Sequence, residues 1–233
     1  MSVGWEDRAA GWIAWARTPG HDGYWAFRDA FFDLLPAPRG RALEVGCGEG
    51  RVCRDLRERG YDIVGLDASR TLVDAAQELD PDGEYLVAAA ERLPFADGSF
   101  DLVVAYNSLM DVTDMPAAVR EAARVLTPGG RFCACVLHPI ADAGRWTSRD
   151  DDASFVIEGS YVEERHYKLP IARDGLEFTF ASRRYPLGAY TRAFEDAGLL
   201  LDALREPRPA PGWRSEGRTS RVPVFLLLRA VKS

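Results

Sequence analysis

Short, continuously apolar runs alternate along most of the chain with longer segments whose apolar residues recur at helical spacing. Continuous apolar runs are typical of strands buried on both faces, and helical spacing is typical of helices that cover such a sheet. The predicted strands cover residues 42–45, 63–67, 85–88, 100–106, 131–137, 199–204 and 222–231, and the predicted helices cover residues 52–59, 71–79, 115–126 and 187–197.

This alternation predicts an α/β fold with a Rossmann-like, doubly wound sheet of seven strands. Residues 206–212, which follow the sixth strand, are rich in proline and too few for a crossover helix. We therefore expect the sheet to be mostly parallel, with an antiparallel last strand. No Pro-, Ser- or Gly-rich tract divides the chain, so residues 1–233 are predicted to form a single domain.

Two segments depart from the strand-helix alternation. Residues 5–35 place tryptophans and other apolar residues at helical spacing, interrupted at residues 18–20, and so predict two N-terminal helices. Residues 140–185 are polar, with irregularly spaced aromatic residues. That second pattern predicts a β-rich or loop-rich insertion, which we expect to cover the substrate.

The run at residues 42–51 breaks into glycines at every second position, Gly46, Gly48 and Gly50. Without a Cβ, glycine allows the backbone to turn sharply after a strand and a ligand to lie against it. Asp67 ends the next predicted strand. A carboxylate there can accept hydrogen bonds from two ribose hydroxyls. The pair predicts a nucleoside site, with an ordinary strand-turn-helix loop as the alternative.

The residue after the third glycine restricts the kind of nucleoside. A dinucleotide fingerprint, G-x-G-x-x-G, requires glycine at its sixth position, and this chain has Arg51 there. Arg51 therefore argues against a dinucleotide-dependent oxidoreductase. The spacing G-x-G-x-G, led by Glu44, instead resembles the first motif of class I S-adenosylmethionine-dependent methyltransferases. Residues 184–187, followed by Gly198 and residues 205–207, resemble the small-molecule branch of that family.

Three further motifs, in the same order and at similar spacings as in that family, extend the resemblance over residues 41–138. They are Gly65-Leu66-Asp67-Ala68-Ser69, Leu93-Pro94-Phe95 with Phe100-Asp101, and Arg124-Val125-Leu126-Thr127-Pro128-Gly129-Gly130. The resemblance implies S-adenosyl-L-methionine as the cofactor. It also implies cofactor contacts at Glu44, Gly46, Cys47, Gly48, Arg51, Asp67, Ala68, Ala90, Glu91, Tyr106 and Asn107.

Within that set, the resemblance puts the methionine end of the cofactor on the glycine loop and Arg51, the ribose on Asp67 and the adenine beside Ala68. The family offers an acid to the adenine amino group where this chain has Ala89. We expect the backbone of Ala90 or the side chain of Glu91 to replace that acid. Tyr106 and Asn107, at the end of the fourth strand, are expected beside the sulfonium.

His138 is the candidate general base. A sulfonium methyl is already electrophilic, so aligning the acceptor and excluding water supply most of the rate. A base is needed only for a hydroxyl, a carbon acid or a protonated amine. His138 closes the fifth strand at the carboxyl edge of the sheet, where ligands bind in such folds. A hydrogen-bonded histidine that shapes the lid is the alternative.

Three residues are candidates for closing the site or contacting the acceptor. His21 and Tyr24 follow the break between the N-terminal helices, a region that folds over the cofactor in the family, although a solvated turn is an equal alternative for His21. Trp146 lies in the predicted cap and offers a flat apolar surface to an aromatic acceptor.

Composition limits the partners. A net charge of −7 disfavours nucleic acid and anionic membranes, and the four cysteines lack CxxC spacing. The N-terminus resembles no signal peptide, so we expect a cytoplasmic protein, and no metal-ligand spacing is present. The predicted function is methyl transfer to a small-molecule acceptor, with a catalytically silent nucleoside-binding subunit as the alternative. The acceptor atom and the oligomeric state stay open.

Overall fold

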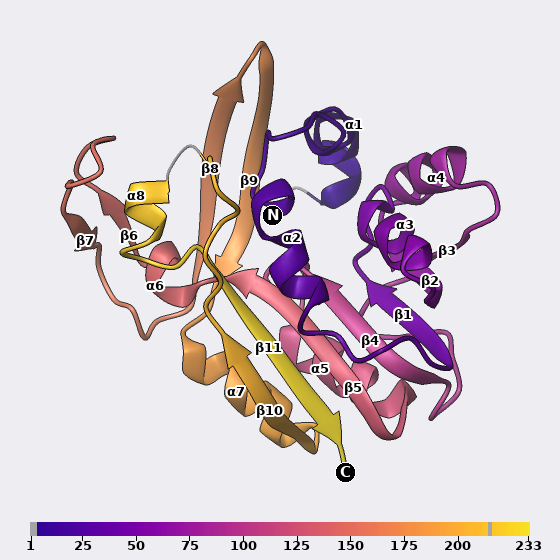
Figure 1. Cartoon of the computed structure of the whole chain (residues 1–233). Coiled ribbons are helices and arrows are strands. Elements are labelled where there is room, and N and C mark those ends of the chain that lie inside the picture. Colours follow the sequence, from indigo (N-terminus) through magenta and orange to yellow (C-terminus); the bar gives the residue numbers. More distant parts are fainter. Residues whose placement is uncertain (1–3, 214–215) are drawn as a thin grey trace.

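A seven-stranded sheet with the strand order β10-β11-β5-β4-β1-β2-β3 forms the centre of the molecule in the computed structural model, which describes residues 4–213 and 216–233 (Figure 1). The strands of this sheet are β1 (Arg41–Val45), β2 (Asp62–Asp67), β3 (Glu84–Val87), β4 (Phe100–Tyr106), β5 (Leu126–Leu137), β10 (Leu199–Arg205) and β11 (Phe225–Lys232). The helices are α1 (Trp5–Ala16), α2 (Tyr24–Phe32), α3 (Arg51–Glu58), α4 (Arg70–Leu79), α5 (Met115–Val125), α6 (Pro139–Asp142), α7 (Leu187–Asp196) and α8 (Glu216–Thr219).

The pairing of the strands confirms the predicted fold class. β1 pairs in parallel with β2 and β4, and β3 and β5 extend the parallel sheet on either side. β11 runs antiparallel to both β5 and β10, as the short connection before it predicts. β5 begins at Leu126 rather than at residue 131, because residues 127–130 form an irregularity in its pairing with β4 and the strand continues through them.

Helices cover both faces of the sheet, so its central strands are buried on both sides. On one face α5 and α7 pack against the sheet, and Phe194 of α7 stacks on Phe132 of β5 with ring centroids 5.1 Å apart. On the other face α2 and α3 contribute residues such as Phe31 and Leu56. This double cover explains the continuously apolar strand sequences.

Residues 140–185, called the cap from here on, contain α6 and two antiparallel hairpins. The first hairpin joins β6 (Gly144–Trp146) to β7 (Phe155–Ile157), and the second joins β8 (Arg165–Arg173) to β9 (Leu176–Arg184). Figure 1 shows the β8–β9 hairpin standing beyond the carboxyl edge of the sheet, beside α1. Both hairpins lie outside the central sheet, so the cap is a separate layer over its edge.

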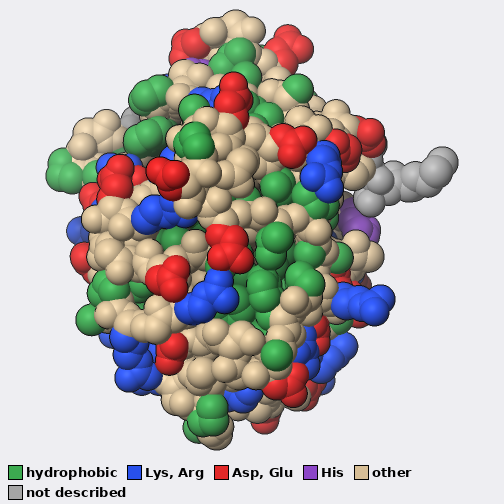
Figure 2. All heavy atoms as spheres, turned by 90° about the vertical axis from the view of Figure 1, so that its right-hand side faces the viewer, with side chains coloured by type: hydrophobic (Ala, Val, Ile, Leu, Met, Phe, Trp, Pro, Cys, Tyr) green, Lys and Arg blue, Asp and Glu red, His purple; other side chains and the backbone are tan. Residues whose placement is uncertain are grey.

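The surface on the side of α3 and α4 mixes charges of both signs. Figure 2 shows acidic and basic side chains interspersed on this face around a group of hydrophobic side chains. Within residues 4–213 and 216–233, no helix is long and apolar enough to span a membrane.

Candidate active site

The glycine-rich turn joins β1 to α3 at the carboxyl edge of the sheet. Gly46 and Gly48 have φ angles of 75° and 55°, in the left-handed region that favours glycine. A Cβ on Gly46 would lie 2.4 Å from the Cβ of Ser108, so the turn passes directly over the end of β4. The Gly46 N–H donates to the carbonyl of Leu66 at 2.8 Å. These contacts fix the turn against the ends of β2 and β4.

Asp67 lies at the end of β2 and is 9% exposed. One carboxylate oxygen accepts a hydrogen bond from the Gly48 N–H at 3.0 Å, and the other accepts from the Ser69 N–H at 2.9 Å. Burial raises the pKa of Asp67, while these backbone donors act to lower it. A carboxylate has about four acceptor positions, so it can accept further hydrogen bonds beyond these. A ribose with two adjacent hydroxyls therefore fits the chemistry of this position, and the next residue, Ala68, is exposed beside it.

Glu44 lies beneath the glycine turn and is 1% exposed. The Cys53 thiol of α3 donates to one of its oxygens at 2.9 Å. Burial raises the pKa of Glu44 to about 8. Cys47, in the turn itself, is also buried, and burial raises the pKa of its thiol. Both side chains support the turn from within, and their contact with a cofactor stays a prediction.

Arg51 connects the glycine turn to the N-terminal helices. Its guanidinium forms an ion pair with Asp22 at 2.7 Å and lies over the rings of Tyr24 and Trp12, 4.3 and 5.2 Å from their centroids. The Trp12 indole nitrogen in turn lies 3.3 Å from where a Cβ on Gly48 would be. A cofactor carboxylate at Arg51 would therefore share the guanidinium with Asp22, under a cover formed by α1.

In the loop predicted to contact adenine, one of the two carboxylate oxygens of Glu91 is already used in hydrogen bonds. One oxygen of Glu91 accepts hydrogen bonds from the backbone N–H groups of Thr113 and Asp114, at 2.8 and 3.0 Å. This oxygen is therefore used just before α5 begins. Ala90 is 7% exposed and belongs to the hydrophobic core. Adenine recognition by these residues stays a prediction.

Tyr106 and Asn107 lie at the end of β4, next to the glycine turn. Tyr106 is buried against Phe31 and Tyr24, with ring centroids 5.0 and 5.4 Å away, and its hydroxyl has no hydrogen-bond partner of good geometry among the described residues. Asn107 adopts a φ of 53°, and its side-chain oxygen accepts from the Cys135 thiol at 3.5 Å.

His138 follows β5 and begins α6. Its Nδ1 accepts a hydrogen bond from the Ile140 N–H at 3.1 Å, and its Nε2 lies 2.9 Å from a carboxylate oxygen of Glu206. Because Nδ1 is an acceptor, Nε2 carries the proton and donates to Glu206. Burial lowers the pKa of His138, although Glu206 acts to raise it. Both ring nitrogens are thus engaged in contacts within the protein.

The three candidates for closing the site or contacting the acceptor have different partners. His21 is buried, with Nε2 3.7 Å from a carboxylate oxygen of Asp174 in the β8–β9 turn. Tyr24 is 2% exposed and donates to Asp55 of α3 at 2.5 Å. Trp146 lies in the β6–β7 hairpin, where it contacts Phe155 and Arg221. Tyr24 also contacts Arg51 and Tyr106 beside the glycine turn. All three roles stay predictions.

The cap approaches the carboxyl edge of the sheet at residues that sequence analysis did not single out. The Arg183 N–H of β9 donates to the carbonyl of Met110 at 3.0 Å, and the Ser182 hydroxyl donates to the carboxylate of Asp111. Asp142 of α6 pairs with Arg184 at 3.3 Å. The only signal in the sequence was that residues 107–112 follow the end of a strand at the ligand-binding edge.

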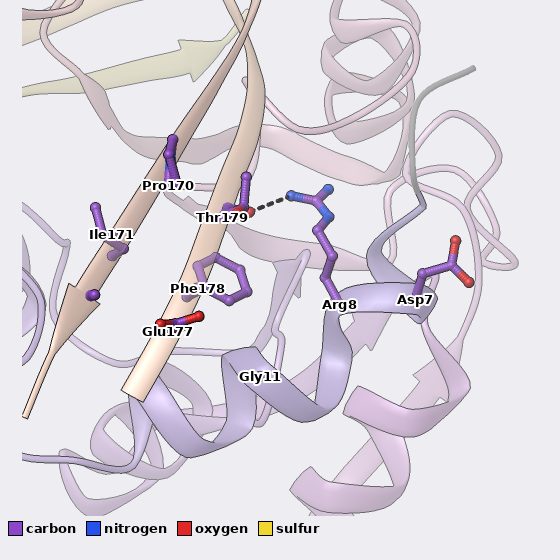
Figure 3. Close-up of a pocket in the computed structure, with 9 residues that line it drawn as sticks. Asp7, Arg8, Gly11, Pro170, Ile171, Glu177, Phe178 and Thr179 are labelled. Atoms are coloured by element: carbon purple, nitrogen blue, oxygen red, sulfur yellow. Dashed lines mark hydrogen bonds between the residues drawn. The ribbon is translucent and has the colours of Figure 1, made fainter. Parts of the chain in front are cut away.

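A cavity of about 560 Å³ lies between α1 and the β8–β9 hairpin (Figure 3). Arg8 extends from α1 toward the hairpin and donates to the carbonyls of Thr179 and Ala181 at 3.4 Å each. Phe178 projects from β9 into the same space. This cavity is a surface gap beside the cap and does not include the glycine turn or Asp67. Within the described ranges, no group of three or more His, Cys, Asp and Glu side chains is arranged to hold a metal ion.

A glycine turn after β1, an acid at the end of β2 and an antiparallel last strand in a seven-stranded sheet agree with the sequence resemblance to S-adenosylmethionine-dependent methyltransferases. Comparison with known proteins leads to the same class. A family profile described as "Methyltransferase domain" matches residues 43–134. Residues 43–134 are therefore similar to a methyltransferase domain.

Individual relatives cover different parts of the chain. A demethylmenaquinone methyltransferase from Beutenbergia cavernae is 40% identical over 48% of this chain and 47% of its own length. The biotin biosynthesis bifunctional protein BioHC from Cellvibrio japonicus is 34% identical over 81% of this chain and 38% of its own length. The chain thus spans about half or less of these relatives.

A solved structure matches over nearly the whole chain. The crystal structure of an S-adenosylmethionine dependent methyltransferase from Mesorhizobium loti superposes with a TM-score of 0.72 at 26% identity, covering 91% of this chain and 98% of the other. The likeness therefore extends well beyond residues 43–134.

Proposed function

We propose that this protein transfers the methyl group of S-adenosyl-L-methionine to a small-molecule acceptor bound between the glycine turn and the cap. The observation that carries the proposal is Asp67, whose carboxylate is held at the end of β2 by the N–H groups of Gly48 and Ser69 and can accept further hydrogen bonds. When bound, the cofactor supplies an electrophilic methyl group.

In this proposal, the residues of the chain bind the cofactor, align the acceptor and exclude water. The glycine turn and Asp67 hold the cofactor, and the cap holds the acceptor in line with the methyl group and excludes water. Alignment of this kind contributes about 7–11 kcal/mol to lowering a barrier. α1 contributes to the exclusion of water, because Trp12 lies over Gly48.

Two features support a small acceptor. The names of two relatives refer to demethylmenaquinone and to biotin biosynthesis, and each concerns a small molecule. The cap also lies directly over the carboxyl edge of the sheet, with the Arg183 N–H on Met110. We also propose a cytoplasmic location, which is supported by four cysteines that are all buried free thiols.

Cofactor titration tests the first part of the proposal. S-adenosylhomocysteine is expected to raise the melting temperature, whereas NAD and NADP are expected to leave it unchanged. Stabilisation by NAD instead would favour an oxidoreductase. Transfer of a labelled methyl group to phenols, amines and acids tests the second part. Tight binding without transfer to any acceptor would favour the silent subunit.

His138 is tested separately, because its contacts with Ile140 and Glu206 favour a role in holding α6 and the 206–212 loop in place. If His138 is the general base, His138→Ala lowers turnover by about 10²-fold or more while leaving affinity for S-adenosylhomocysteine unchanged. Equal turnover in the variant would assign it to the scaffold.

A further inference from the structure

Asp111 is a carboxylate that lies between the end of β4 and strand β9 of the cap. Asp111 lies one turn beyond the end of β4, and its N–H donates to the carbonyl of Ser108 at 2.9 Å. Ser108 packs beneath Gly46 and donates to the carbonyl of Val45 at 2.6 Å. A single short turn therefore connects Asp111 to the glycine turn, so its position is fixed relative to the cofactor side of the site.

The cap holds the Asp111 side chain from the opposite side. The Ser182 hydroxyl of β9 donates to one carboxylate oxygen, and the neighbouring Arg183 N–H donates to the carbonyl of Met110. Among the described residues the other Asp111 oxygen has no hydrogen-bond partner, and it is not a buried unsatisfied atom. That oxygen is therefore available to a bound molecule.

Charged groups from several elements face Asp111. Burial raises its pKa to about 7, and the charges of Asp67 and Asp142 act in the same direction. The Ser182 hydroxyl and the charge of Arg8 oppose that rise. Two phenols in the surroundings, Tyr167 of β8 and Tyr190 of α7, have raised pKa values to which Asp111 contributes. Arg184 pairs with Asp142 rather than with Asp111.

We propose that Asp111 takes up the proton of the methyl acceptor, whose nucleophile is an O–H or N–H group. This inference rests on the proposed function. In the step, the acceptor oxygen or nitrogen forms a bond to the methyl carbon, and the bond from that carbon to sulfur breaks with its electron pair remaining on sulfur. The acceptor's proton passes to the free oxygen of Asp111. Ser182 is a positioning residue that holds the carboxylate.

The variants Asp111→Asn and Asp111→Glu test this proposal. The probes are phenol and benzylamine, with thioanisole as an acceptor whose nucleophile has no proton, and a labelled methyl donor. Asp111→Asn is expected to bind S-adenosylhomocysteine within twofold of the natural protein and to lose about 10²-fold or more in kcat/KM. Asp111→Glu, which keeps a carboxylate, is expected to recover part of that loss.

The dependence of kcat/KM on pH distinguishes a proton acceptor from a structural carboxylate. The base acts when deprotonated, so activity is expected to fall as pH decreases through about 7. Ser182→Ala removes a hydrogen bond to the charged form and is expected to move this acidic limb to higher pH. Asp142→Asn removes a neighbouring negative charge and is expected to move it to lower pH.

Several outcomes would overturn the inference. Full activity of Asp111→Asn is one such outcome, and methylation of thioanisole but of neither phenol nor benzylamine is another. A third is an acidic limb of the kcat/KM profile that neither Ser182→Ala nor Asp142→Asn moves. Carboxyl carbon NMR of the S-adenosylhomocysteine complex gives a test without an acceptor. The Asp111 resonance is identified as the one that disappears in Asp111→Asn. If this resonance does not titrate between pH 6 and 8, Asp111 is not the base. Failure of the natural protein to bind S-adenosylhomocysteine would instead contradict the proposed function.

Discussion

The central sheet and the cap meet at one edge but are stabilised differently. In β1 and β4 nearly every residue is buried, including Leu43 and Val104, which have no exposed surface. In β8 and β9 most residues are partly or fully exposed, and Leu169 is 51% exposed. The sheet depends on apolar burial, whereas the cap is attached by polar contacts together with an aromatic contact of Phe178 with Trp5 and Trp12. In the proposed function, the cofactor therefore lies on a densely packed core and the acceptor under a more exposed layer.

The largest expected difference between the two regions is in core packing. Leu43→Ala, in β1, is expected to lower the free energy of unfolding by about 2–5 kcal/mol, because it leaves a cavity in a fully buried strand. Leu169→Ala, in β8, is expected to change it by about 0.5 kcal/mol or less. Urea unfolding of both variants measures the difference. Equal losses would mean that the cap is as tightly packed as the sheet.

Asp67→Ala tests whether the sheet edge holds the cofactor. Loss of the paired hydrogen bonds to the ribose is expected to weaken binding of S-adenosylhomocysteine by about 2 kcal/mol or more. Asp62→Ala is a matched control, because Asp62 is an exposed carboxylate at the other end of the same strand. Isothermal titration calorimetry measures both affinities. Unchanged affinity in Asp67→Ala would remove this residue from the site.

Glu44→Gln tests whether the buried carboxyl group of Glu44 in the sheet makes stability depend on pH. The pKa of Glu44 is about 8 in the folded protein against an ordinary value of 4.5, so the folded state binds more protons than the unfolded state between these pH values. The natural protein should therefore lose stability relative to Glu44→Gln as pH rises through this window, with a limiting slope of about 1.4 kcal/mol per pH unit. Urea unfolding at several pH values measures this slope, and parallel curves would contradict the protonated state.

The smallest expected effect concerns the polar attachment of the cap. Arg173 donates to the carbonyls of Gly20 and His21, at 2.7 and 3.2 Å. Arg173→Ala is expected to cost about 1 kcal/mol or less globally but to speed amide hydrogen exchange in the β8–β9 hairpin. Lys168→Ala, an exposed position in β8, is the control. Unchanged exchange in Arg173→Ala would show that other contacts hold the hairpin.

The sequence by itself determined the sheet, its antiparallel last strand and the positions of Gly46 and Asp67. These follow from local pattern, because burial on both faces requires continuous apolar runs and a sharp turn after a strand requires glycine. The start of β5 was missed by five residues, since the Pro128-Gly129-Gly130 segment is typical of a turn but lies inside the strand as an irregularity.

The tertiary structure decided which partner each polar side chain has. Arg51 pairs with Asp22, His138 with Glu206 and Ser182 with Asp111, and these partners are separated by 29, 68 and 71 residues respectively. No periodicity encodes such pairs, because they depend on how the N-terminal helices and the cap pack over the edge of the sheet. The same packing brings Asp111 next to the site, although the sequence around it carries no motif.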